Sequence, residues 1–135
     1  MNFTLDIKEQ YSLIDLQESF LGNDIPAALE EVARKALRSS HNVILNLEVC
    51  KDLDSTGAAV LRKINRLCAN DLGTFVVVSK DDDMIDKLDE ARIQDLEIFY
   101  SVEEAIDAVF MHDLENEFGA GEDGYDAEDY DNDQD

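Results

Sequence analysis

The middle of this chain, residues 43–61, has the sequence VILNLEVCKDLDSTGAAVL. Its first part, Val43–Leu47, is almost continuously apolar, which is typical of a central strand that is covered on both faces. A loop is expected from Glu48 to Ser55, and an amphipathic helix from about Thr56 to Asn70. Two adjacent hydroxyl residues therefore lie at a helix start that closely follows a buried strand.

The same alternation of strands and helices extends in both directions from this segment. The hydrophobic periodicity predicts strands at 3–7, 11–16, 74–78 and 97–100, and helices at 24–37, 81–91 and 101–110. The first two strands are close enough to form a hairpin. The element order is thus ββαβαβαβα, which predicts an α/β fold, a small mixed β-sheet with helices packed against it.

Charge divides the chain into two parts. The whole sequence holds 11 basic and 33 acidic residues, a formal net charge of −22. The last basic residue is Arg92, and residues 113–135 contain 11 of the acidic residues. We therefore predict one folded domain over residues 1–115 and a disordered acidic tail over residues 116–135.

The composition and the motif content exclude several classes of function. A net charge of −22 opposes direct binding of nucleic acid and of anionic membranes, because both depend on Lys and Arg. The sequence shows neither a membrane-spanning apolar run nor a signal-peptide pattern, so we predict a cytoplasmic protein without membrane insertion. No nucleotide-binding, hydrolase or metal-ligand motif is present, and we expect no enzyme activity, no cofactor and no metal site. The two cysteines, Cys50 and Cys68, are expected to be buried thiols.

The segment Asp54-Ser55-Thr56-Gly57 permits two interpretations. In the first, its polar side chains cap the helix and the glycine allows a close approach of the backbone. In the second, one hydroxyl accepts a phosphate, which adds about −1.5 to −2 charges at pH 7. The backbone N–H groups of a helix N-terminus would tolerate that phosphate, whereas a partner docked over the same surface would be repelled.

Together with its flanking strand and helix, this segment resembles the STAS domain of bacterial anti-sigma factor antagonists, which has the pattern strand, loop, D-S-[ST]-G and helix. The resemblance covers roughly residues 3–112 by element order. It implies that the unphosphorylated protein binds an anti-sigma factor with kinase activity and thereby releases a sigma factor. Phosphorylation would break that complex, and a PP2C-type phosphatase would restore it. The phosphorylated hydroxyl corresponds to Thr56, with Ser55 as the second choice.

The expected partner-binding residues lie on two parts of the helix: Asp54, Ser55, Thr56, Gly57 and Ala58 at its start, and Arg62, Lys63 and Arg66 on its polar face. The basic cluster is either a solvated face or a surface that docks an acidic partner or the acidic tail of the protein. The alternative function is that of a STAS scaffold or adaptor that is not phosphorylated, in a signalling or lipid-transport complex. Under that alternative, removal of the Thr56 hydroxyl would leave binding intact.

Overall fold

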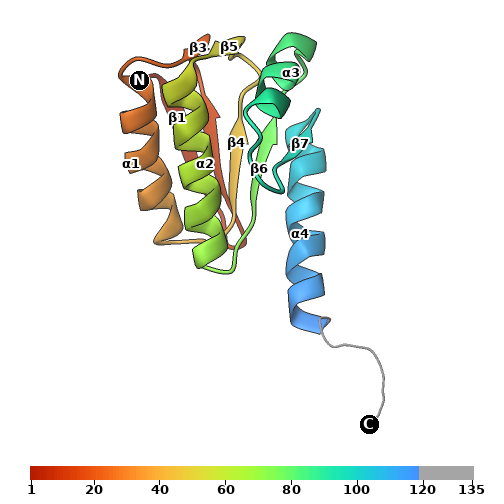
Figure 1. Cartoon of the computed structure of the whole chain (residues 1–135). Coiled ribbons are helices and arrows are strands. Elements are labelled where there is room, and N and C mark those ends of the chain that lie inside the picture. Colours follow the sequence, from red (N-terminus) through yellow and green to blue (C-terminus); the bar gives the residue numbers. More distant parts are fainter. Residues whose placement is uncertain (119–135) are drawn as a thin grey trace.

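The main sheet has the strand order β1-β2-β4-β6-β7 in the computed structural model, which describes residues 1–118 (Figure 1). Its strands are β1 (Phe3–Ile7), β2 (Ser12–Leu16), β4 (Val43–Asn46), β6 (Phe75–Val78) and β7 (Glu97–Phe99). β1 pairs with β2 in an antiparallel hairpin, and the other neighbours pair in parallel. The predicted mixed sheet is therefore confirmed, with β4 as its central strand.

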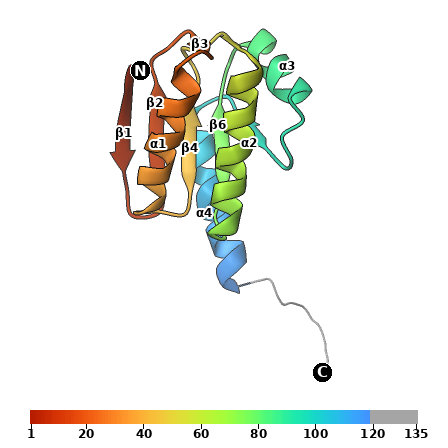
Figure 2. The same cartoon turned by 60° about the vertical axis from the view of Figure 1, so that its left-hand side comes forward.

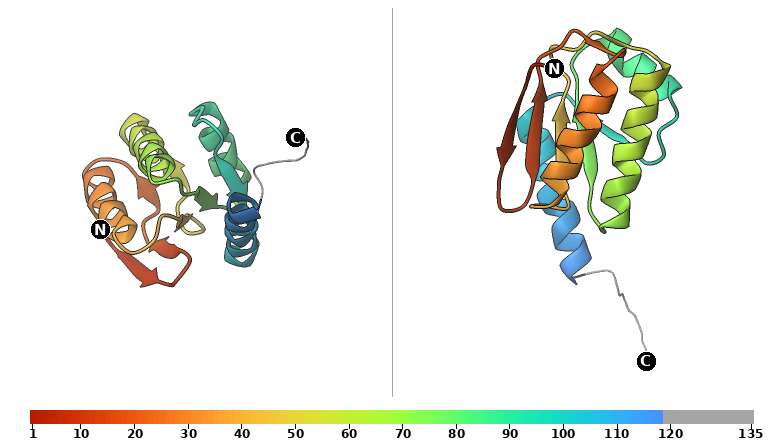
Figure 3. Two further views of the ribbon diagram at one scale, coloured as in Figure 1. Left: turned by 90° about the horizontal axis from the view of Figure 1, so that it is seen from below. Right: turned by 90° about the vertical axis from the view of Figure 1, so that its left-hand side faces the viewer.

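The helices are α1 (Ile25–Leu37), α2 (Ser55–Asn70), α3 (Asp82–Glu90) and α4 (Val102–Phe118). Figure 3 shows α1, α2 and α3 on one side of the sheet and α4 on the other. Figure 2 shows the β1–β2 hairpin at the edge of the sheet, next to α1. This arrangement leaves the central strand enclosed between two layers of helices.

Strand β4 explains why both layers are needed. Val43 and Leu45 belong to the apolar cluster beneath α1 and α2, whereas Ile44 belongs to the cluster beneath α4. All three side chains are fully buried. Because successive side chains of a strand point to opposite faces, a continuous apolar run has to be covered twice.

Helix α4 extends beyond its predicted end at residue 110 and reaches Phe118. The apolar spacing of the predicted helix at 101–110 places Phe110 on its inward face, but its side chain is 37% exposed. Its ring instead meets the ring of Tyr11 edge-on, with centroids 6.3 Å apart. Residues 119–135, which make up most of the predicted acidic tail, lie outside the described residues, so the predicted boundary at residue 116 stays a prediction.

A second, two-stranded sheet is not foreseen by the sequence pattern. Strand β3 (Phe20–Leu21) pairs in parallel with β5 (Asp52–Leu53), inside the segment that was expected to be a loop. Each strand has two residues, which is too short for an alternating pattern to be recognised. This pairing joins the chain before α1 to the chain just before α2, so it positions the start of α2.

The two cysteines are unpaired and fully buried, which confirms the expectation of buried thiols. Burial raises the pKa of the Cys68 thiol to about 12 and also raises the pKa of the Cys50 thiol. Because only a thiolate reacts readily, both thiols are chemically protected while the domain is folded. Within residues 1–118, no helix has both the length and the apolar character needed to span a membrane.

Candidate functional site

The carboxylate of Asp54 caps helix α2. Its Oδ1 accepts a hydrogen bond from the backbone N–H of Gly57 at 2.9 Å, so the capping interpretation is confirmed. The same oxygen accepts a hydrogen bond from the hydroxyl of Thr56 at 2.5 Å. These two donors, the Thr56 hydroxyl foremost, stabilise the charged form and hold the pKa of Asp54 below its ordinary value. The hydroxyl of Thr56 is thus oriented by a charged neighbour.

Two glycines allow the chain before α1 to pack closely against the start of α2. A Cβ atom on Gly57 would lie 2.3 Å from the backbone oxygen of Leu21, which also accepts a hydrogen bond from the backbone N–H of Asp54. A Cβ atom on Gly22 would lie 2.4 Å from Oδ2 of Asp54. The backbone N–H of Asn23 donates to that second carboxylate oxygen at 3.4 Å. Side chains at either glycine would therefore push the cap away from β3.

The first turn of α2 presents its hydroxyls outward and its small residues inward. Ser55 and Thr56 are exposed, whereas Gly57 and Ala58 are buried. Ala58 is only 8% exposed, so it offers little surface to a partner. The surface that a partner could meet at this point therefore includes the two hydroxyls, the edge of the Asp54 carboxylate and Ala59.

The three basic residues of α2 follow this turn, and they do not share one set of partners. Arg62 donates from Nε and Nη2 to the backbone oxygen of Ala91, at 3.3 and 3.1 Å, at the end of α3. Lys63 forms an ion pair with Glu30 of α1 at 3.2 Å. Arg66 has no ion-pair partner within residues 1–118. The structure brings Asp54 through Ala58 together, but it directs Arg62 and Lys63 toward different helices.

An ion pair beside the cap has no counterpart in the sequence analysis. Lys87 of α3 pairs with Asp52 of β5, two residues before the capping carboxylate. The pair lowers the pKa of Asp52 and raises the pKa of Lys87. It connects α3 to β5, the strand that leads into the cap. Neither spacing nor periodicity in the sequence predicts this pair, because the two residues are 35 positions apart and become neighbours only in the folded chain.

The site contains a hydroxyl and a carboxylate but no imidazole. His41 contacts Asp113 at 3.3 Å, and His112 contacts Glu97 at 2.7 Å, both at the opposite end of the sheet from Thr56. In the described part of the chain, no group of three or more His, Cys, Asp or Glu residues could hold a metal ion.

The Thr56 hydroxyl should make the titration of Asp54 depend on residue 56. Replacing Thr56 with valine removes the donor while keeping the branched shape, so we expect the pKa of Asp54 to rise toward its ordinary value. A lowered carboxyl pKa contributes stability above the unfolded-state value and loses it as the pH falls through the folded-state value. The acid side of the stability curve should therefore be less steep in Thr56→Val.

The measurement is the carboxyl ¹³C shift of Asp54 from about pH 2 to about pH 6, a range that spans an ordinary aspartate titration. The control is Ser55→Ala, because the Ser55 hydroxyl has no hydrogen-bond partner within residues 1–118. An equal shift of the Asp54 titration in both variants would show that the Thr56 hydroxyl does not hold the carboxylate.

Comparison with known proteins places the family and the fold. The family profile described as STAS domain matches residues 2–105. No curated protein sequence matches the chain significantly. Among solved structures, the anti-sigma factor antagonist SpoIIAA in its unphosphorylated form is similar, with a TM-score of 0.65 and 18% identity over 81% of this chain and 98% of that chain.

Two further solved structures show how widely this architecture is used. A variant of RsbS from Moorella thermoacetica has a TM-score of 0.70 and 14% identity, over 84% of this chain and 99% of that chain. The murine anion transporter Slc26a9 has a TM-score of 0.63 and 13% identity, over 77% of this chain but only 18% of the transporter. At these identities the likeness establishes the α/β fold that the element order predicted.

Proposed function

The chain belongs to the STAS domain family of non-catalytic regulatory modules, and on this premise we propose that it is a binding module whose contact with a partner is switched by phosphorylation of Thr56. In the proposed cycle the unphosphorylated form binds an anti-sigma factor with kinase activity in the cytoplasm. Phosphorylation ends that contact, and a PP2C-type phosphatase restores it. The fold supports this role because the similar protein SpoIIAA has been solved in a phosphorylated form as well, with a TM-score of 0.62 and 19% identity.

The observation that carries the proposal is the exposed Thr56 hydroxyl, which lies 2.5 Å from the carboxylate of Asp54 in the first turn of α2. In the proposed reaction, the terminal phosphoryl group of the kinase's ATP forms a bond to Oγ1 of Thr56, ADP leaves, and the hydroxyl proton is released. The hydrogen bond to Asp54 is lost with that proton. About −1.5 to −2 charges then stand beside an existing carboxylate.

This change of charge explains why a partner would dissociate. The N–H groups at the start of α2 stabilise part of the new charge, so the domain itself tolerates the phosphate. A partner that covers the same surface would have to remove water from two neighbouring negative groups, the phosphate and the carboxylate of Asp54, and this desolvation is costly. The free domain and the complex therefore respond to the phosphate in opposite ways.

Thr56 is favoured over Ser55 because its hydroxyl is held in one orientation. The carboxylate of Asp54 fixes the Thr56 hydroxyl, whereas the Ser55 hydroxyl has no such partner in the described part of the chain. A hydroxyl with a defined position is more easily aligned with a donor phosphate than one that rotates freely. We therefore expect phosphate on Thr56.

Phosphopeptide mapping of the protein isolated from its own cells, in growth and under stress, tests this proposal. Cleavage after Lys51 and Arg62 releases a peptide that holds both candidate hydroxyls and no other. We expect phosphate on Thr56 in a fraction that changes with conditions. Thr56→Val should abolish that phosphate, and the matched Ser55→Ala variant should retain it.

Other outcomes of the mapping would contradict the proposal in distinguishable ways. Phosphate that persists in Thr56→Val and disappears in Ser55→Ala would move the switch by one residue. A peptide that is unmodified under every condition would contradict the switch and favour the alternative of an unphosphorylated STAS scaffold or adaptor in a signalling or lipid-transport complex.

A further inference from the structure

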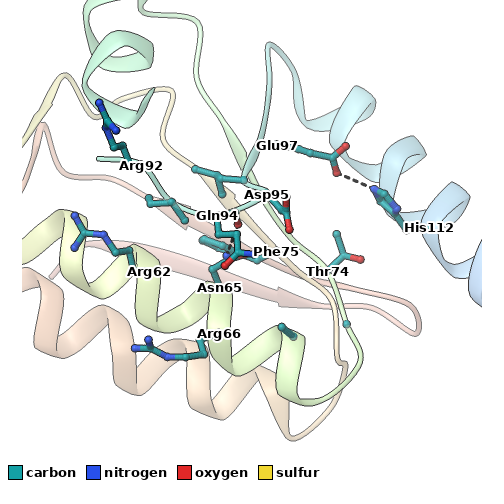
Figure 4. A pocket seen from close by; sticks show the side chains of 14 residues that line it. Arg62, Asn65, Arg66, Thr74, Phe75, Arg92, Gln94, Asp95, Glu97 and His112 are labelled. Atoms are coloured by element: carbon teal, nitrogen blue, oxygen red, sulfur yellow. Dashed lines mark hydrogen bonds and ion pairs between the residues drawn. The ribbon is translucent and has the colours of Figure 1, made fainter. Parts of the chain in front are cut away.

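A groove lined by arginines lies along the second half of α2, away from Thr56 (Figure 4). Arg62 and Arg66 come from α2, and Arg92 comes from the segment between α3 and β7. These are three of the five arginines of a chain with a net charge of −22. We propose that this arginine groove, defined by Arg62, Arg66 and Arg92, binds the acidic segment 122–135 of the same chain.

The two sides of the groove are held together by hydrogen bonds. Side chains of α2 bind the backbone of the segment between α3 and β7, which forms the opposite side. Arg62 donates to the backbone oxygen of Ala91, and Nδ2 of Asn65 donates to the backbone oxygen of Gln94 at 2.8 Å. The chain between these two carbonyl groups includes Arg92, which has a φ of 53°. A positive φ is uncommon outside glycine. Figure 4 shows Arg92 on the same side of the groove as Arg62.

The positive charge of the groove is not neutralised within residues 1–118. Arg66 and Arg92 have no ion-pair partner there, and Arg62 is bound only to a neutral carbonyl group. Of the two carboxylates that line the groove, Glu97 is held by His112 at 2.7 Å. Asp95 is the other, so one acidic side chain faces three guanidinium groups. An anionic ligand would be attracted to the arginine end.

The geometry favours an extended acidic peptide over a compact anion. Figure 4 shows the three guanidinium groups spread along one side of the groove and not converging on a single point. A phosphate ion would require convergent donors, whereas carboxylates spaced along a peptide can meet separate arginines. Residues 122–135 provide eight acidic side chains and no basic one.

The covalent connection brings that segment within reach. His112 of α4 lines the groove, and α4 continues to Phe118. Helix α4 carries the chain about 9 Å from His112 to Phe118. The 17 residues 119–135 could extend over about 56 Å at about 3.3 Å per residue, so the acidic side chains that follow residue 121 can return to the arginines. A tethered segment acts at an effective concentration in the millimolar range, which offsets the weakness of exposed ion pairs.

Occupation of the groove would regulate access to it. While the acidic segment is bound, α2 presents no free arginine cluster, and any acidic partner has to displace the segment first. This inference does not depend on phosphorylation of Thr56, which lies at the other end of α2. The two proposals can therefore fail separately.

Paramagnetic broadening in the full-length chain tests the inference. A nitroxide attached through Ala127→Cys would label the acidic segment alone, because Cys50 and Cys68 are fully buried. At low salt we expect broadening of the backbone amides of 62–66 and 91–96. In about 1 M salt the Debye length falls to about 3 Å, and the broadening should be lost.

Two charge-matched double variants make the test specific. Arg66→Gln with Arg92→Gln should abolish the broadening in the groove. Lys35→Gln with Arg38→Gln removes the same charge from exposed basic residues of α1 and its end, and it should leave the broadening unchanged.

Three results would overturn the inference. One is broadening that is uniform or centred on Lys35 and Arg38. The second is broadening that survives the groove variant or high salt. The third is broadening that disappears on dilution, because contact within one chain does not depend on protein concentration.

Discussion

Gly57→Ala is expected to lower the free energy of unfolding by about 2 kcal/mol, although alanine is the better helix former. A Cβ atom at this position would lie 2.3 Å from the backbone oxygen of Leu21. That oxygen cannot move alone, because it belongs to β3 and accepts the backbone N–H of Asp54. The strain would therefore spread to the cap and to the β3–β5 sheet.

Urea unfolding measures this effect, with Ala59→Gly as the control. Ala59 is exposed in the same turn of α2, so its replacement with glycine should cost the ordinary helix-propensity difference of about 1 kcal/mol. The two variants exchange the same residue types in opposite directions, and both are expected to destabilise. A Gly57→Ala variant more stable than the wild type would show that the close approach to Leu21 is absent in solution.

Leu45→Ala is expected to have the larger effect on stability, a loss of about 4 kcal/mol. Leu45 is fully buried in the central strand, in a cluster of 19 buried residues that α1, α2 and α3 cover. Because three helices and the sheet enclose this layer, it has little freedom to collapse into the space left by the leucine side chain. A loss of this size is a large share of the about 5–15 kcal/mol that stabilises an ordinary domain.

Ile44→Ala is the matched comparison, because Ile44 precedes Leu45 and points to the other face. Its cluster contains five buried residues, and α4 is the one helix of the described chain that covers it. We expect a smaller loss, about 2–3 kcal/mol, since a single helix can move inward. Denaturant midpoints at unchanged m-values give both losses. A larger loss for Ile44→Ala would contradict the assignment of the main core to the α1–α2 layer.

The architecture was predictable because each main strand and helix is long enough for its hydrophobic pattern to be recognised in the sequence. The uninterrupted apolar run at Val43–Leu47 and the three-to-four-residue spacing in α2 both arise from the need to bury one or two faces. The prediction was wrong at Phe110, which continues the apolar spacing of α4 but is 37% exposed and meets the ring of Tyr11 edge-on. The strands β3 and β5 were missed since two residues contain no period.

Part of the candidate site was likewise predictable from the sequence, and part was not. The capping carboxylate, both hydroxyls and the need for a small residue at Gly57 follow from the residue types in one short segment. The order of Arg62 and Lys63 along α2 suggested one basic face. In the folded chain they diverge, because side chains at adjacent helix positions point about 100° apart and meet different neighbours.

Local sequence thus determined the order of strands and helices, the cap of α2 and the hydroxyl that we propose as the phosphate acceptor. Tertiary structure alone determined which residue Gly57 must avoid, the pairing of Lys87 with Asp52, and the placement of Arg62, Arg66 and Arg92 along one groove. The physical reason is the range of the interactions. Periodicity and capping act within one element, whereas these contacts join elements whose proximity depends on the path of the whole chain.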